Sequence, residues 1–245
     1  MAKKAFVLGV PTAISYDIVE CDGRLGVVYE LIKSKTLGEL IRNNPENLDE
    51  YIAMYVDVCK SIHEIEAKPN SLPSFKSINE VDIGNVTDIT DEEREILYDF
   101  LRTVPESNHC VHGDLNMNNI MVENGKCLLI DMGEFSQGTY LWDISRLLFS
   151  LEFAVEGGEI NSFYKMPHAL VKKTYEGLFK SYFGVDDLSK IEEVDPNAKW
   201  LYPMAWFRSI TSMLKGQRWS EEKRNLAKHL LRDKLIPFYK KEKGE

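Results

Sequence analysis

The pattern of side chains near the N-terminus predicts a two-stranded antiparallel ribbon. Residues 14–20 and 25–32 are both rich in β-branched and aromatic residues, which favour strands. Between them, Asp22 and Gly23 form the Asp-Gly pair typical of a tight hairpin turn. Residues 2–8 instead predict the end of a helix, because glycine and proline follow almost at once.

Beyond the ribbon the apolar spacing becomes helical, and helix-start signals precede several apolar runs. Thr36 with Glu39, and Thr90 with Glu93, each match a capping box. Asp49 is expected to cap a longer helix. Helical periodicity is expected over residues 49–66, 140–155, 168–183, 197–215 and 220–240.

Two short apolar stretches in this helical region are expected to be strands that flank a polar loop. They lie at residues 110–111 and 126–130. Residues 67–89, which contain two prolines and a glycine, are expected to form a loop. A ribbon followed by a mostly helical body with one small hairpin predicts an α+β fold rather than alternating βαβ units.

The composition is that of a globular protein with a real core, since 44% of the 245 residues are hydrophobic and 28% are charged. The formal net charge of −9 argues against general nucleic-acid binding, which needs a basic surface. It is compatible with a cationic small-molecule substrate, although simple solubility explains the charge better.

The cysteines and the N-terminus indicate a cytoplasmic protein. The four cysteines show no C-x-x-C spacing, so neither a zinc site nor a redox motif is expected. Lys3 and Lys4 precede a short apolar run that Pro11 breaks, and no cleavage site follows. No apolar stretch approaches the ~20 residues that span a bilayer, so we expect no membrane partner.

Residues 112–119, His-Gly-Asp-Leu-Asn-Met-Asn-Asn, combine the side chains that phosphoryl transfer needs. That reaction uses a carboxylate to orient the attacking hydroxyl and oxygen ligands for magnesium. Asp114 meets the first need, and Asn119 can offer its amide oxygen. Asp131 follows a short apolar strand and is placed as a second, stronger ligand of the type that Mg²⁺ prefers.

These residues resemble the motifs of aminoglycoside phosphotransferases, choline kinases and their relatives. Residues 112–119 are similar to the family's H-G-D-x-x-x-x-N catalytic loop. Residues 130–134, Ile-Asp-Met-Gly-Glu, resemble its I-D-x-G-[DE] segment, the counterpart of D-F-G in protein kinases. Gly138 and residues 140–144 resemble its G-x-x-x-x-D-[IL] stretch. Together the two loop motifs are highly specific, and the similarity covers roughly residues 5–215.

The resemblance implies a protein-kinase-like fold, ATP and Mg²⁺ as cofactors, and a role for each motif residue. Asp114 is expected to be catalytic, and Asn119 and Asp131 are expected to bind the metal. His112 and Asp143 are expected to support the loop structurally. His112 is not expected to be the base, because the base in such enzymes is the aspartate at the position of Asp114.

The second strand of the ribbon and its polar connector resemble the last N-lobe strand and hinge. Adenine is therefore expected to bind the backbone at Tyr29, Glu30 and Leu31, although Glu30 fits an exposed strand-end carboxylate equally well. We expect residues 1–33 to be a remnant of the N-lobe and hinge, and residues 34–245 to be the helical C-lobe.

Several N-lobe elements of an intact kinase of this type have no counterpart here. These are a phosphate-covering loop, a strand lysine and a helix glutamate, and neither Lys3 nor Lys4 fits the lysine. Three explanations stay open: a shortened chain, a degenerate relative that binds without catalysis, or a site completed by another chain. The open edge of the ribbon invites strand pairing, which is compatible with a homodimer.

Other candidate residues have simpler explanations. Trp200, Tyr202, Trp206 and Phe207 fall on one predicted helix, where core packing is favoured over an aromatic cage for a quaternary ammonium. Glu134 stays open between a second metal contact and a solvated side chain. A metallophosphatase is rejected because only one of the five histidines lies in the motif region.

The leading hypothesis is an ATP- and magnesium-dependent phosphotransferase, a kinase of a small-molecule hydroxyl. The alternative is a non-catalytic, kinase-like remnant that binds a small molecule or a protein partner. The substrate stays unnamed, because acceptor pockets are built from variable helices and loops.

Overall fold

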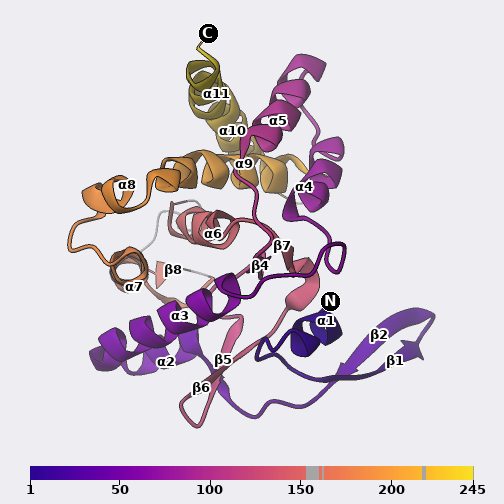
Figure 1. Cartoon of the computed structure of the whole chain (residues 1–245), viewed down its shortest axis with the longest axis vertical. Helices are drawn as coiled ribbons and strands as arrows, with labels where there is room; N and C mark the ends of the chain where they lie inside the picture. Colours follow the sequence, from indigo (N-terminus) through magenta and orange to yellow (C-terminus); the bar gives the residue numbers. More distant parts are fainter. Residues whose placement is uncertain (153–159, 162, 217–218, 245) are drawn as a thin grey trace.

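The computed structural model places a two-stranded ribbon beside a larger, mostly helical body (Figure 1). The structure describes residues 1–152, 160–161, 163–216 and 219–244. Among these described residues, no helix is both long and apolar enough to cross a membrane.

The N-terminal elements follow the sequence pattern closely. They are α1 (Ala2–Val7), β1 (Ser15–Cys21) and β2 (Arg24–Tyr29). The strands are antiparallel, with Ile18 opposite Val27. Asp22 and Gly23 in the turn have positive φ angles of 50° and 73°, as an Asp-Gly hairpin requires. The predicted helix and ribbon are therefore confirmed.

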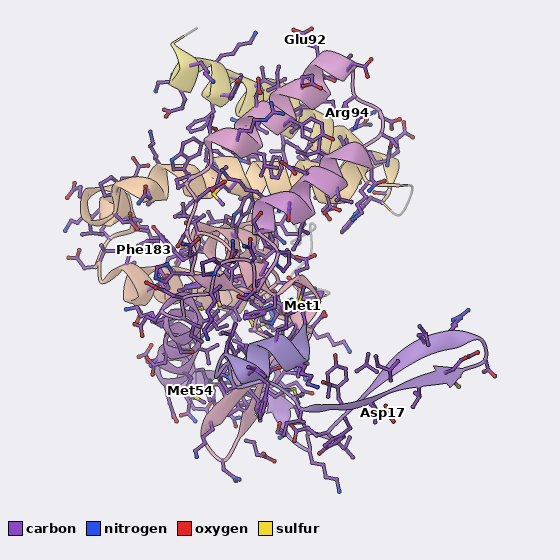
Figure 2. The ribbon with its side chains drawn as sticks, turned by 45° about the vertical axis from the view of Figure 1, so that its right-hand side comes forward. Met1, Asp17, Met54, Glu92, Arg94 and Phe183 are labelled. Atoms are coloured by element: carbon purple, nitrogen blue, oxygen red, sulfur yellow. The ribbon has the colours of Figure 1, made fainter. Side chains whose placement is uncertain are left out.

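The ribbon stands clear of the body, and its apolar side chains stay in contact with solvent. Figure 2 shows Asp17 of β1 well away from the helices. Ile18 is 68% exposed and Leu25 is 80% exposed. Within the described part of the chain, β1 and β2 pair with each other and with no further strand, so both outer edges carry unpaired backbone groups.

Short strands in the body frame the polar loop at residues 112–119. They are β3 (Lys35–Thr36), β4 (Cys110–Val111), β5 (Ile120–Glu123), β6 (Lys126–Leu129), β7 (Ser136–Gln137), β8 (Ile160–Asn161) and β9 (Met166–Pro167). The two expected strands are present as β4 and β6, but they do not pair with each other, because β4 pairs with β7 and β6 pairs with β5. Asn124 and Gly125 turn the β5–β6 hairpin with φ angles of 50° and 75°, a sequence signal that we overlooked.

The rest of the body consists of helices. They are α2 (Leu37–Asn43), α3 (Leu48–His63), α4 (Phe75–Gly84), α5 (Asp91–Thr103), α6 (Leu141–Glu152), α7 (His168–Phe183), α8 (Ile191–Val194), α9 (Leu201–Leu214), α10 (Glu221–His229) and α11 (Ile236–Lys243). Helix α9 packs along α6, and α3 packs along α7. Helices α4, α5, α10 and α11 gather at the end of the body away from the ribbon (Figure 1).

Helix starts follow local chemistry. Both predicted capping boxes are present, at Thr36 ahead of α2 and at Thr90 ahead of α5. The loop expected at 67–89 is wrong in its middle, where Ser74 caps α4 by accepting a hydrogen bond from the Ser77 N–H at 3.1 Å. Asp49 is not a cap either, since it lies inside the first turn of α3.

The later helices match the periodicity with two differences. The helix expected at 140–155 is observed as α6, and residues 153–155 lie outside the described residues. The helix expected at 220–240 is interrupted by a π-helical turn at Leu230–Leu235. Periodicity alone does not show such a one-residue change in winding.

Aromatic packing of α9 agrees with a core role for two of its four candidate residues. Trp200 and Phe207 are buried, with ring centroids 6.0 and 5.4 Å from Phe100. Tyr202 is 49% exposed and its ring lies 6.3 Å from that of Trp206. Trp200 ends the 3₁₀ turn ahead of α9. Because two of the four side chains are buried and Tyr202 is exposed, the four do not form one cage.

Candidate functional site

The polar loop at 112–119, which we call the catalytic loop, enters from β4 and leaves into β5. Gly113 has a φ angle of +89°, which side-chain-bearing residues rarely adopt. A Cβ added there would lie 2.5 Å from Cβ of Glu134 and 2.8 Å from the ring of Phe75. Glycine is therefore required at the second position of the motif by both conformation and space.

Asp143 at the start of α6 holds the first residues of this loop. Its carboxylate accepts hydrogen bonds from the His112 N–H at 2.8 Å and the Gly113 N–H at 2.7 Å. His63 of α3 lies 3.1 Å from the same carboxylate through Nε2. Asp143 is fully buried, and although burial raises its pKa, the His63 hydrogen bond and the other donors bring the pKa below its usual value.

His112 links the catalytic loop to the segment that carries Asp131. Its Nε2 lies 3.0 Å from the Ile130 carbonyl and its Nδ1 accepts a hydrogen bond from the Asp114 N–H at 3.2 Å. The Ile130 N–H donates to the Asn119 carbonyl at 3.0 Å. These hydrogen bonds tie the two motifs together through His112.

Asp114 is partly buried in the catalytic loop, with its side chain 29% exposed. One carboxylate oxygen, Oδ1, lies 2.9 Å from Arg146 Nε. The other accepts a hydrogen bond from the Asn119 amide nitrogen at 3.3 Å, and the Asp114 carbonyl accepts from the same nitrogen at 2.8 Å. Because the Asn119 nitrogen faces Asp114, its amide oxygen is directed elsewhere and can serve as a ligand.

Asp131 begins the short 3₁₀ turn Met132–Glu134 and is exposed. Its backbone is left-handed, with φ 60° and ψ 52°, a conformation that aspartate tolerates better than most residues. This places a solvent-facing carboxylate directly after the strand that His112 and Asn119 hold. Among the described residues, no three His, Cys, Asp or Glu side chains lie close enough to hold a metal ion by themselves.

A cavity of about 470 Å³, the ribbon-side cavity, lies between the end of the ribbon and Asp131. Tyr29 and Glu30 line it, but Leu31 does not: Leu31 is 81% exposed, and Ile32 lines the cavity instead. Glu30 bonds back to Ile14 through its N–H at 3.0 Å and its Oε1 at 2.8 Å. The Glu30 N–H, which was expected to be available to adenine, is therefore already hydrogen-bonded to Ile14.

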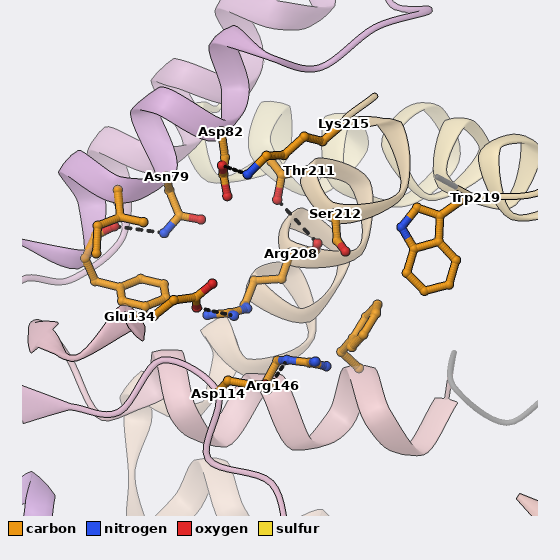
Figure 3. A pocket seen from close by; sticks show the side chains of 13 residues that line it. Asn79, Asp82, Asp114, Glu134, Arg146, Arg208, Thr211, Ser212, Lys215 and Trp219 are labelled. Carbon is orange, nitrogen blue, oxygen red and sulfur yellow. Dashed lines mark hydrogen bonds and ion pairs between the residues drawn. The ribbon is translucent and has the colours of Figure 1, made fainter. Parts of the chain in front are cut away.

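A second cavity of about 360 Å³, the helix-side cavity, lies on the other side of the catalytic loop between α4, α6 and α9 (Figure 3). Asp114 lines it, together with Arg146, Arg208 and Lys215. Burial lowers the pKa of Arg208, and the nearby Glu134 carboxylate opposes this shift. The sequence motifs did not single out these basic residues, although Arg146 lies three residues after Asp143 on the same helix and could have been noticed.

A carboxylate-bearing loop between two cavities, braced by a buried aspartate, is the arrangement of a kinase-like phosphotransferase. Residues 2–163 match the model of the phosphotransferase enzyme family (APH). The chain therefore belongs to that family. No curated protein sequence matches the chain.

Solved structures of low sequence identity share the fold. A thermostable mutant of aminoglycoside phosphotransferase APH(4)-Ia, in a ternary complex with ADP and hygromycin B, has a TM-score of 0.62 at 14% identity, over 96% of this chain and 82% of that chain. Ethanolamine kinase from Plasmodium vivax has a TM-score of 0.54 at 18% identity, over 98% and 72%. The complex of gentamicin with APH(2")-IIa has a TM-score of 0.55 at 17% identity, over 94% and 77%. The predicted α+β, kinase-like fold is confirmed.

Proposed function

We propose that this chain transfers the γ-phosphoryl group of ATP to a hydroxyl of a small molecule. The observation that carries the proposal is the position of the catalytic loop between two cavities. Asp114 lines the helix-side cavity, whereas Asp131, tied to the same loop, lines the ribbon-side cavity. Donor and acceptor can therefore approach each other at this loop from opposite sides.

In this proposal the acceptor hydroxyl donates a hydrogen bond to Asp114. Its oxygen forms a bond to the γ-phosphorus while the bond from that phosphorus to the β-phosphate oxygen breaks, and ADP leaves. The hydroxyl proton passes to the Asp114 carboxylate. Arg146 and Asn119 orient this carboxylate through the contacts at 2.9 and 3.3 Å.

Asp131 and the amide oxygen of Asn119 fit a magnesium ion, because both offer hard oxygen donors and neither histidine nor cysteine accompanies them. Bound magnesium would neutralise charge on the phosphates. Since two protein ligands do not fill its shell, phosphate oxygens and water would supply the remainder. His112 and Asp143 act in this scheme by fixing the loop and touch no substrate.

Nucleotide binding is expected to be weak. The apolar side chains of Ile32, Met121 and Ile130 suit an adenine ring, and Tyr29 offers further contact area. No described residue that lines the ribbon-side cavity is basic, so the phosphates meet no positive side chain there. This observation favours the second candidate function, a kinase-like protein that binds without catalysis.

Calorimetric titration of magnesium-ATP tests the proposal. We expect a dissociation constant in the ~millimolar range, about −4 kcal/mol, and weaker binding in Asp131→Asn. Asp186→Asn is the matched control, because Asp186 is an exposed carboxylate that pairs with Lys190. No heat of binding in the unmodified chain would refute ATP as the donor. If ATP binds but no ADP forms with any hydroxyl compound tested, the second candidate function would be favoured.

Two further expectations concern assembly and location. The exposed apolar residues and open edges of the ribbon support a homodimer formed through it. Sedimentation of the chain and of Ile18→Lys would show a dimer that the substitution weakens, and a monomer at every concentration would contradict it. All four cysteines are free, which supports a reducing, cytoplasmic location.

A further inference from the structure

Every carboxylate among the described residues that line the helix-side cavity lies against a basic side chain of the same cavity. The pairs are Asp114 with Arg146, Glu134 with Arg208 and Asp82 with Lys215 (Figure 3). A polycationic acceptor needs carboxylates that are not yet neutralised. The three carboxylates of this cavity are each paired with a base, so the lining has no excess negative charge that would favour a cationic acceptor.

Helix α9 presents a stripe of hydrogen-bond donors to this cavity. Arg208, Thr211 and Ser212 of α9 line it, and their spacing of three and four residues places them on one helix face. Lys215, the C-cap residue of α9, lines it as well. Figure 3 shows Arg208 reaching into the cavity from α9, and Lys215 from the C-terminal end of that helix. Two positive charges and a nearby Ser212 hydroxyl are therefore offered from a rigid element.

Arg208 is anchored but its hydrogen-bonding capacity is not filled. Its Nη2 donates to the Gly113 carbonyl at 2.8 Å, and its guanidinium lies 4.9 Å from the ring centre of Phe75. The contact of Nη2 with Glu134 is long, at 3.4 Å, and the Glu134 side chain is 48% exposed. The other nitrogen, Nη1, is buried and has no acceptor in the described part of the structure. A buried cationic N–H without an acceptor is costly and indicates a missing partner.

We infer that the acceptor carries an anionic oxygen group, a carboxylate or a phosphate, close to the hydroxyl that receives the phosphoryl group. The anion binds between Arg208 and Lys215, while the hydroxyl reaches Asp114. A cavity of about 360 Å³ suits a small molecule of this kind. The inference rests on the proposed function, because it names the acceptor class for the same site.

The test uses four three-carbon probes that differ in charge and share the same hydroxyl frame. They are glycerol, 3-amino-1,2-propanediol, glycerate and glycerol 3-phosphate. Their binding to the chain is measured by NMR titration without nucleotide, so the result does not depend on phosphoryl transfer. We expect glycerate, glycerol 3-phosphate or both to bind at least about tenfold more tightly than the neutral and cationic probes. The two anionic probes distinguish a carboxylate from a phosphate.

Two lysines provide a matched pair of variants. Lys215 and Lys199 are 48% and 45% exposed in their side chains, and each pairs with one acid, but only Lys215 lines the cavity. Lys215→Gln is expected to weaken the anionic probe about fivefold, and Lys199→Gln is expected to leave it unchanged. Arg208→Gln should weaken it by about tenfold or more, with folding checked by circular dichroism because Arg208 also bonds to the catalytic loop.

The possible outcomes separate the inference from the proposed function. Equal binding of all four probes, preference for the cationic probe, no binding of any probe, or equal loss in both lysine variants would overturn the anionic acceptor. Anionic binding without ADP formation would support the inference while the proposed function fails. ADP formation with only neutral or cationic probes would overturn the inference and leave the proposed function standing.

Discussion

Removing the Asp143 carboxylate should unlock the catalytic loop and cost a large part of the stability. In Asp143→Ala, three buried donors lose their acceptor: the N–H groups of His112 and Gly113, and Nε2 of His63. Each unsatisfied donor costs about 1–3 kcal/mol, but these costs do not add fully because neighbours relax together. We expect a loss of about 3–5 kcal/mol, the range for breaking a buried charged network.

Urea unfolding followed by circular dichroism measures this loss. A loss of that size should lower the midpoint by roughly 1–2 M urea and is a large share of a typical stability of about 5–15 kcal/mol. Asp143→Asn retains one acceptor oxygen and should lose less, about 1–3 kcal/mol. Asp186→Ala, in an exposed pair with Lys190, should lose under about 0.5 kcal/mol.

The pH dependence supplies an independent check with a definite sign. The pKa of Asp143 is lower in the folded protein than its usual value, so its contribution is present above the unfolded pKa of about 3.9. The contribution is lost as the pH falls through the lower folded pKa. The difference between the wild-type chain and Asp143→Ala should therefore be constant near neutral pH and shrink below about pH 4. A loss under about 1 kcal/mol at neutral pH would refute the bracing role.

The remaining predictions concern catalysis, backbone strain and thiol reactivity. Asp114→Asn should lower kcat by ~100-fold or more with ATP affinity almost unchanged. A coupled ADP assay measures the rate and calorimetry measures the affinity, and a near-normal rate would exclude the role. Gly113→Ala should lower the free energy of unfolding by about 2 kcal/mol or more. Gly23→Ala, also at positive φ but with nothing within 4 Å of the added Cβ, should lower it by only about 1 kcal/mol. Equal losses in urea unfolding would contradict the role of crowding at Gly113. Exposed Cys21 should react quickly with a thiol reagent, whereas Cys110 should react slowly as long as the protein is folded, since burial raises the pKa of Cys110 to about 11. Equal reaction rates of the two thiols in the native protein would show that Cys110 is accessible.

The geometry of the catalytic loop does not depend on the ribbon, so an intact loop is compatible with the weak nucleotide binding that we propose. The loop is held by contacts inside the body, from His63, His112 and Asp143. The ribbon contributes Tyr29 and Glu30 to the cavity wall but does not contact the catalytic loop through any hydrogen bond among the described residues. The metal-binding candidates are therefore expected to keep their geometry whether or not the ribbon gains a partner.

Interactions between residues close in the chain were predictable from the sequence. The capping box of Thr36 joins residues three positions apart, and the Asp22-Gly23 turn needs only its own backbone angles. The expected positions of Asp114, Asn119 and Asp131 came from a spacing motif, and the structure places them around one junction. Their roles stay proposals, because a motif identifies the residues and does not measure what they bind.

Contacts between distant segments could not be predicted in this way. The pairing of β4 with β7, and the start of α4 at Phe75 inside a segment with two prolines, depend on neighbours contributed by other parts of the chain. Leu31 was expected at the hinge through its backbone; its side chain is 81% exposed and it lies beyond the end of β2, and whether its backbone binds adenine stays a prediction.

The sequence by itself determined the family, the α+β architecture and which residues form the catalytic loop, because these depend on local spacing and on a motif of polar side chains. Only the tertiary structure decided what surrounds that loop. Asp82, Arg208 and Lys215 come from α4 and from the end of α9, more than a hundred residues apart, and they carry no shared motif. Their convergence on Asp114 results from helix packing, and this packing sets the charge that an acceptor meets.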